Sequence, residues 1–278
     1  MEKGVIWGAG GTGRHVYELS KQSVQVLFFV DNDSTKWGTT CIDGKLIKSP
    51  DELKNIKLDV ILLGTLMGLD EVPNQLKELG RSDIRLDSTY VNISVKSRIM
   101  FLQRFAQRVY KEKILGNVAE AGVYRGEFAK YINEFFYDRK CYLFDTFNGF
   151  TDIDIELEQE ESLTFANHLK DVCIEETLAK MPYKDKIDVR VGRFPESATE
   201  IDDKFVFVNL DMDLYEPTIE GLRFFYPKMS DGGVILIHDY FNKAYPNIEK
   251  AINDFEKELG KRLHKIPIGD DISMAILK

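Results

Sequence analysis

Two apolar runs in the C-terminal third of the chain constrain its fold more than any other feature. They cover residues 205–210 and 232–237, and acidic side chains follow each run directly. A short apolar run that ends abruptly at polar residues is typical of a buried strand in a parallel sheet. The stretch between the runs is long enough for a crossover helix, so we expect the two strands to be parallel neighbours.

The side chains that follow these runs are of the types found in catalytic and ligand-binding sites. They are Asp211, Asp213, His238 and Asp239. Neighbouring strands lie about 4.8 Å apart, and open α/β sheets bind their ligands beyond the carboxyl ends of the strands. We therefore expect these four side chains to lie close together at one edge of a sheet.

Length and charge narrow the class of protein. The 278 residues are enough for two domains of ordinary size, and the net charge of −9 argues against binding to nucleic acid or to an anionic membrane surface. No apolar run reaches the roughly 18 residues that an integral membrane segment needs. The first residues lead directly into a strand, and the three cysteines show no metal-site spacing, so a cytoplasmic protein is expected. The sequence leaves the oligomeric state open and is compatible with a homo-oligomer.

Strand–glycine–helix openings occur twice, at Gly8–Gly13 and at Glu120–Gly126. Strands and helices alternate after each opening, which indicates parallel sheets. The predicted fold is α/β with two Rossmann-like domains, residues 1–95 and 96–278, and an amphipathic helix at 97–112 begins the second.

The first opening fits a dinucleotide-binding fingerprint. Gly8, Gly10 and Gly13 follow a strand, and Asp31 ends the next strand, where it is placed to bind a ribose hydroxyl. A unit of about 90 residues is short for a complete NAD domain. The sequence therefore predicts a small nucleotide-binding domain with a parallel sheet.

The second opening offers two acids beside a glycine turn. Gly122 allows close approach of the backbone to a ligand, and the following helix begins with free N–H groups. Glu120 and Asp145 each end a strand, and each is placed to bind hydroxyl or ammonium groups of a nucleoside.

With the acid-tipped runs, this second half resembles the macrocin O-methyltransferase family. The resemblance covers about residues 97–278, and its motifs are EAGVYRG, DTFNGF, GRFPES, LDMDLY and GGVILIHDY. It implies a class I S-adenosylmethionine (SAM) fold with a reversed last strand, and methylation of sugar hydroxyls. It also implies that SAM is bound by Glu120, Gly122, Gly126, Asp145, Gly192 and Phe194.

The resemblance further implies a divalent metal, with magnesium expected, held by Asp213 and Asp239 beside the general base Asp211. The sequence does not decide which of Asp211 and Asp213 is the base. The family usually has Asp-Asp before the tyrosine, whereas this chain has His238-Asp239. Three interpretations of His238 stay open: a catalytic base, a ligand of a softer metal, or a buried structural residue.

The first half resembles the nucleotide-sugar-binding domain of bacterial sugar acetyltransferases, through Gly8–Gly13, residues 30–33 and residues 44–47. Together the halves predict a SAM-dependent O-methyltransferase in a bacterial surface-glycan (polysaccharide) or nucleotide-sugar pathway, acting on a sugar or nucleotide-sugar. Two alternatives stay open, an NAD(P)-dependent nucleotide-sugar oxidoreductase and a non-catalytic nucleotide-binding module.

The acidic insertion at 151–162 is either a surface loop or a lid over the acceptor.

Overall fold

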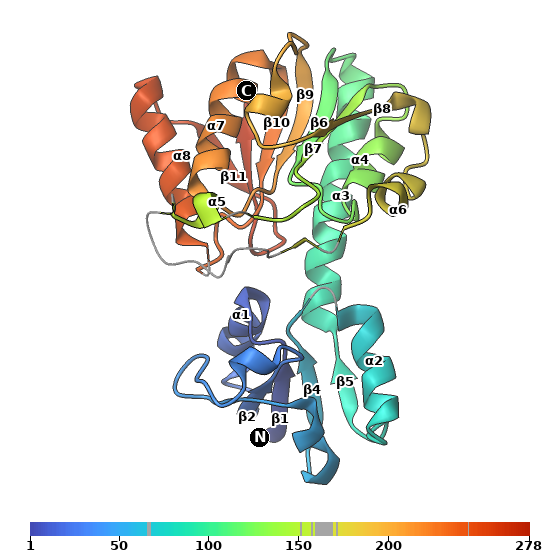
Figure 1. The fold of residues 1–278 in the computed structure, drawn as a ribbon, viewed down its shortest axis with the longest axis vertical. Helices are drawn as coiled ribbons and strands as arrows, with labels where there is room; N and C mark the ends of the chain where they lie inside the picture. The colour runs from blue at the N-terminus through green and yellow to red at the C-terminus, as the bar shows by residue number, and fades with distance from the viewer. Residues whose placement is uncertain (66–67, 151, 157, 159–168, 171, 244) are drawn as a thin grey trace. The chain divides into compact units, whose positions relative to one another are not determined.

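The computed structural model describes residues 1–65, 68–150, 152–156, 158, 169–170, 172–243 and 245–278 (Figure 1). The chain divides into two compact units, residues 1–96 and 97–278. Half of the acidic insertion, residues 151, 157 and 159–162, lies outside the described residues. The first part of a helix that the sequence predicts at about 163–181 also lies outside them, namely residues 163–168.

The first unit is built on a five-stranded sheet in the order β3-β2-β1-β4-β5, in which every neighbouring pair is parallel. Its strands are β1 (Glu2–Trp7), β2 (Val24–Val30), β3 (Ile47–Lys48), β4 (Val60–Leu63) and β5 (Arg85–Asp87). Its helices are α1 (Gly11–Ser20), α2 (Gly68–Glu78) and the short 3-10 turns Ser34–Lys36 and Pro50–Asn55. Trp7 and Phe29 are almost completely buried within it.

Helix α3 (Thr89–Glu112) is longer than the helix that the sequence predicts, and the division between the units falls inside it. The apolar periodicity is clear only after residue 97, because the first two turns carry β-branched and short polar residues of low helix propensity. The helix starts earlier because the Asp87 carboxylate accepts the Thr89 N–H at 3.0 Å and caps its first turn.

The second unit is built on a seven-stranded sheet in the order β11-β12-β10-β9-β6-β7-β8. Its strands are β6 (Asn117–Ala121), β7 (Cys141–Asp145), β8 (Ile187–Val191), β9 (Phe205–Leu210), β10 (Met229–Ile237), β11 (His264–Pro267) and β12 (Met274–Leu277). Strand β12 is antiparallel to both of its neighbours, β10 and β11, whereas β6 to β10 pair in parallel. This confirms the predicted α/β fold with a reversed last strand.

Helices cover both faces of the larger sheet (Figure 1). After α3, the described helices of this unit are α4 (Ala129–Phe135), α5 (Asp152–Glu156), α6 (Ile174–Ala179), α7 (Tyr215–Phe225), α8 (Pro246–Leu259) and the 3-10 helices Lys184–Lys186, Glu196–Ala198 and Tyr226–Lys228. Side chains of α7 and α8, among them Leu222 and Ile252, form one buried cluster with the sheet. Side chains of α3 and α4, among them Leu102 and Ile132, form the other. Fully burying such a side chain contributes about 1.5–3 kcal/mol, so the two clusters fix the sheet between its helices.

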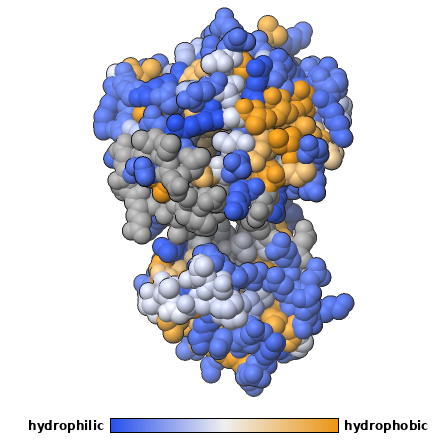
Figure 2. All heavy atoms as spheres, in the orientation of Figure 1, coloured by the Kyte–Doolittle hydropathy of each residue, from blue (hydrophilic) through white to orange (hydrophobic). Residues whose placement is uncertain are grey.

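Figure 2 shows a mostly hydrophilic face with hydrophobic residues gathered on one part of the larger unit. Among the described residues, no helix combines the length and the apolar character that a membrane span requires.

Candidate active site

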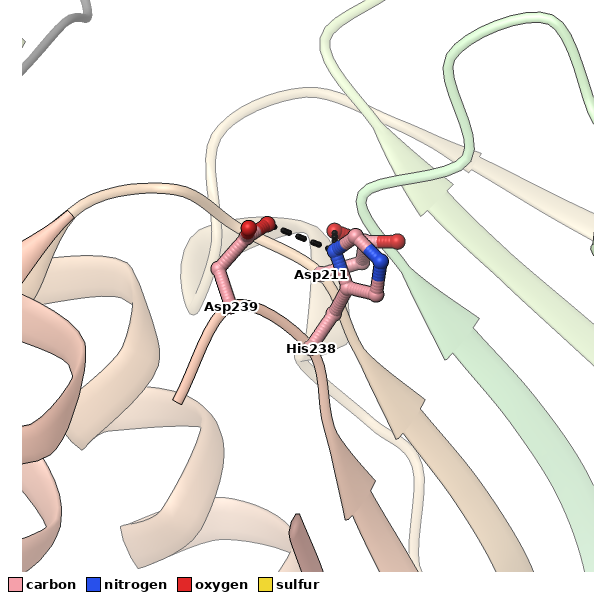
Figure 3. A group of neighbouring side chains, drawn as sticks. All are labelled: Asp211, His238 and Asp239. Atoms are coloured by element: carbon pink, nitrogen blue, oxygen red, sulfur yellow. Dashed lines mark hydrogen bonds and ion pairs between the residues drawn. The ribbon is translucent and has the colours of Figure 1, made fainter. Parts of the chain in front are cut away.

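The acid-tipped strands meet at the carboxyl edge of the larger sheet. Strands β9 and β10 are parallel neighbours, and the main-chain N–H of His238 donates to the carbonyl of Leu210 at 2.9 Å. His238 Nδ1 lies 2.9 Å from Asp211 Oδ1 and 2.6 Å from Asp239 Oδ2 (Figure 3). The imidazole therefore bridges two carboxylates from neighbouring strands.

These contacts determine the charges of the bridge. Burial and the charge of Arg98 would lower the pKa of His238, but Asp211 and Asp239 outweigh them and raise this pKa to about 10. Burial would likewise raise the pKa of Asp211, but His238 and then Arg98 hold that pKa well below its usual range. At neutral pH the bridge is thus an imidazolium between carboxylates.

Asp213 differs electrostatically from Asp211. Burial, followed by the charges of Asp239 and Asp211, raises the pKa of Asp213 well above its ordinary value. Asp213 and Asp239 both have left-handed backbone, with φ of 60° and 57°, a conformation that Asp tolerates better than most residues. The chain thus turns sharply where these two carboxylates leave their strands.

Gly122 brings the first loop of the unit against the end of β9. Its φ is +86°, and a Cβ built there would lie 1.8 Å from the Asp211 carbonyl oxygen. Only glycine can occupy this position without moving the backbone. The loop between β6 and α4, the predicted SAM loop, therefore lies directly beside the acidic cluster.

Asp145 shapes this same loop from the end of β7. Its Oδ2 accepts the N–H groups of Val123 and Tyr124, each at 2.7 Å, and its Oδ1 accepts the N–H of Phe147 at 2.7 Å. Main-chain groups therefore use three of the roughly four acceptor positions of the carboxylate. The predicted contact with a ribose hydroxyl stays a prediction, with one position left to make it.

Glu120 is the most deeply buried acid of the site, with 2% of its surface exposed. Its Oε1 accepts from Asn209 Nδ2 at 2.8 Å, whereas its Oε2 is buried and has no hydrogen-bond partner among the described residues. Burial raises the pKa of Glu120 to about 8. An unpaired buried carboxyl oxygen is costly, and a cationic ligand group would satisfy it.

Arg98 and Asn209 belong to the site, and the sequence analysis does not predict either. Arg98 Nη2 donates to Asn209 Oδ1 at 3.0 Å and to Asp211 Oδ2 at 3.1 Å. Both residues carry a recognisable signal in the sequence. Arg98 lies four residues before Leu102 on the apolar stripe of α3, and Asn209 interrupts an otherwise apolar strand.

The remaining residues predicted for SAM lie around the same loops. Gly126 ends the first loop, where its N–H donates to the Val123 carbonyl at 2.8 Å. Gly192 follows β8, and its N–H donates to the Asp145 carbonyl at 2.9 Å. The Phe194 ring packs in the core, 5.6 Å between centroids from Phe225, so its contact with adenine stays a prediction.

In the first unit, Gly8, Gly10 and Gly13 lie in the loop and first turn that join β1 to α1. Asp31 is held by its own chain, since Oδ2 accepts the Ala9 N–H at 2.9 Å and also lies 3.3 Å from the Lys36 ammonium. The predicted contact of Asp31 with a ribose is untested and would have to compete with these donors.

The donor atoms of the bridge fit a divalent cation. Asp211, His238 and Asp239 each offer one ligand atom, and these atoms all lie within 4.8 Å of one another. Two carboxylates with one imidazole suit manganese, iron or zinc better than magnesium, which prefers oxygen ligands alone. Of the two ligands that the sequence predicts, Asp239 is part of this group and Asp213 is not.

The fold of the second unit is that of the class I methyltransferases. Residues 70–269 match the model of the family described as "Macrocin-O-methyltransferase (TylF)". The chain belongs to this family, as its motifs predict. Residues 1–86 match a second family, described as "C2185-like, N-terminal", a description that names no ligand or activity.

Named relatives agree with this assignment. The chain is 26% identical over 178 residues to mycinamicin III 3''-O-methyltransferase of Micromonospora griseorubida, which covers 59% of this chain and 69% of that protein. It is 26% identical over 195 residues to 8-demethyl-8-(2,3-dimethoxy-alpha-L-rhamnosyl)-tetracenomycin-C 4'-O-methyltransferase of Streptomyces olivaceus, covering 66% and 72%. The solved structure of the O-methyltransferase NovP superposes with a TM-score of 0.56 at 22% identity, over 66% of this chain and 79% of that one.

Proposed function

We propose that this protein transfers the methyl group of SAM to a sugar hydroxyl in a bacterial surface-glycan or nucleotide-sugar pathway. The observation that carries the proposal is the acidic cluster around His238, which lies directly beside the Gly122 loop. One substrate would thus meet the other at the carboxyl edge of the sheet. A relative whose name includes a rhamnosyl group supports a sugar as the acceptor.

The loop after β6 has the features that the methionine end of SAM requires. SAM supplies an electrophilic methyl group when it is bound. The free Oε2 of Glu120 would accept from the methionine ammonium, and that cation would favour ionisation of this buried acid. Gly122 would allow the backbone to lie against the ligand.

We assign Asp213 as the general base, which exchanges the roles that the sequence analysis gave to Asp211 and Asp213. A carboxylate with a raised pKa is the stronger base near neutral pH, and that carboxylate is Asp213. The positive charges of His238 and Arg98 stabilise the ionised Asp211 carboxylate and lower its pKa, which makes Asp211 a weak base.

Asp211, His238 and Asp239 would hold a divalent cation, which would replace the proton on His238 Nδ1. Such a cation lowers the pKa of a hydroxyl that binds to it. We further propose that the glycine loop of the first unit binds the nucleotide part of the acceptor or a second nucleotide, because a helix N-terminus after a glycine turn favours phosphate.

The proposal is tested with methyl-labelled SAM and a panel of nucleotide-sugars and sugar glycosides, with products identified by mass spectrometry. Asp213→Asn should lower turnover by about 100-fold or more if Asp213 is the base. The matched control is Asp185→Asn, because Asp185 is an exposed carboxylate paired with Lys186. Equal turnover of the two variants would remove the assignment, and no labelled product from any sugar would overturn the proposed function.

Metal binding is tested without turnover. Manganese should bind to the metal-free protein, as seen by titration in electron paramagnetic resonance, and magnesium should compete weakly. His238→Asp supplies three carboxylates and should shift the preference toward magnesium. Failure of the wild type to bind any divalent ion would refute the metal site and leave His238 as an imidazolium bridge.

A further inference from the structure

One hydrogen-bonded network runs from the predicted SAM end of the site to the predicted acceptor end. Glu120 accepts from Asn209 at 2.8 Å, Asn209 accepts from Arg98 at 3.0 Å, and Arg98 donates to Asp211 at 3.1 Å. Asp211 then contacts His238 at 2.9 Å. Every link is within ordinary hydrogen-bond distance.

Arg98 is the member of this network that comes from outside the sheet. Glu120, Asn209 and Asp211 belong to, or directly follow, strands β6 and β9, whereas Arg98 is on helix α3. A single nitrogen, Nη2, donates to both Asn209 and Asp211. This one atom therefore links the Asn209 and Asp211 side chains at the end of β9.

Packing holds the guanidinium in place. Its Cζ lies 4.0 Å from the centre of the Phe128 ring, and 13% of the Arg98 side chain is exposed. A planar guanidinium that stacks on an aromatic ring is restrained both in its distance from the ring and in its tilt. An ammonium has no plane to stack, so its orientation is not restrained in this way. Because the group is nearly enclosed, its hydrogen bonds are not exchanged freely with water.

We propose that Arg98 is a positioning residue, which holds the Asp211 carboxylate against His238 and ties the acceptor side of the site to Asn209 and Glu120 on the cofactor side. Asp211 has two carboxylate oxygens, and each has a different partner, His238 for Oδ1 and Arg98 for Oδ2. Without Arg98, of these two contacts only the one between Oδ1 and His238 would orient the carboxylate. This inference rests on the proposed function for its catalytic meaning and on the contacts alone for its geometry.

The first test is kinetic. Arg98→Met should lower kcat by about 100-fold, because a displacement of about 1 Å in a reacting group has that effect. The affinity for S-adenosylhomocysteine (SAH), measured by calorimetry, should change little, because Glu120 keeps its bond from Asn209. Arg98→Lys keeps the charge but loses the planar stacking group, so it should show a similar loss. The control is Arg104→Met, on an exposed turn of the same helix.

Two further measurements separate positioning from a loss of structure. Guanidinium ion at a concentration that does not denature the protein should restore part of the kcat of Arg98→Ala and none of that of Asp211→Asn. In the Asp211→Asn background, Arg98→Met should have no further effect on kcat, because the two residues act through one contact. Unchanged kcat in Arg98→Met, or a loss of SAH affinity with kcat preserved, would overturn the proposal.

A readout without turnover keeps this inference distinct from the proposed function. The chain has four histidines, so the His238 ring can be assigned in the nuclear magnetic resonance spectrum of histidine-labelled protein. Arg98→Met should shift the His238 Nδ1 resonance because Asp211 moves, and Arg104→Met should not. An unshifted resonance would refute the positioning role even if methyl transfer is established. Absence of methyl transfer in the wild type would refute only the proposed function.

Discussion

Replacing Gly122 by alanine tests the closest backbone approach in the site. The glycine has a φ of +86°, and a Cβ there would lie 1.8 Å from the carbonyl oxygen of Asp211 and 2.6 Å from its carbonyl carbon. A non-glycine residue held in the left-handed backbone region lowers the free energy of unfolding by about 1–2 kcal/mol relative to glycine. Forcing an extra carbon into packed structure destabilises the folded protein by a further 1–3 kcal/mol, roughly. We therefore expect Gly122→Ala to lower the free energy of unfolding by about 2–5 kcal/mol.

Gly260→Ala is the matched control for this prediction. Gly260 follows helix α8 with a φ of +67°, and nothing lies within 4 Å of a Cβ built there. This variant should therefore show the backbone effect of about 1–2 kcal/mol and no clash.

Thermal unfolding with differential scanning calorimetry measures both variants. For a domain of 150–250 residues, 1 kcal/mol shifts Tm by about 2–4 °C. Gly122→Ala should therefore melt roughly 2–12 °C below Gly260→Ala, and its SAH affinity should fall because the loop must move. If the two variants melt together, the contact between the Gly122 loop and the end of β9 is refuted, and the shared site with it.

Three further predictions concern single carboxylates and the imidazole. Asp145→Ala removes the side-chain acceptor of three main-chain N–H groups and should weaken SAH binding by about 10- to 100-fold. Asp145→Asn keeps one oxygen and should weaken SAH binding less, as calorimetry will measure. The pKa of Glu120 is raised from 4.5 to about 8, so between these values the folded protein keeps a proton that the unfolded chain releases. The wild type therefore loses stability as pH rises from about 5 to about 8, and Glu120→Gln, which does not titrate, should gain stability relative to it. Urea unfolding at the two pH values measures this difference. The pKa of His238 is raised from 6.5 to about 10, so the protonated imidazole stabilises the folded state fully below pH 6.5, and this stabilisation is lost as pH approaches 10. In the same assay, His238→Gln should be less stable than the wild type at low pH, and the difference in the free energy of unfolding should shrink over that range.

The sequence predicts those features of the fold that depend on local pattern. The strands β9 and β10 are apolar runs with abrupt polar ends, so both their existence and their parallel pairing are predictable. The family resemblance implies a reversed last strand, and β12 is antiparallel to both β10 and β11. The start of α3 is missed, because a side-chain cap from Asp87 determines it rather than an apolar stripe.

The predictable part of the site is its location, and the unpredictable part is its internal pairing. The residues at the strand ends are visible in the sequence, but the partner of each one depends on tertiary contacts. Arg98 reaches Asp211 across 113 positions of the chain, a contact that no local pattern reveals. For the same reason the sequence could not separate Asp211 from Asp213, whose different surroundings set their pKa values apart.

The most direct test of this account is calorimetric titration of the purified protein with SAH, with NADH as the comparison. The site described around Glu120, Gly122 and Asp145 predicts that SAH binds, and that the affinity falls in Gly122→Ala but not in Gly260→Ala. Heat from NADH alone, with none from SAH, would contradict the account and move the search for chemistry to the first unit.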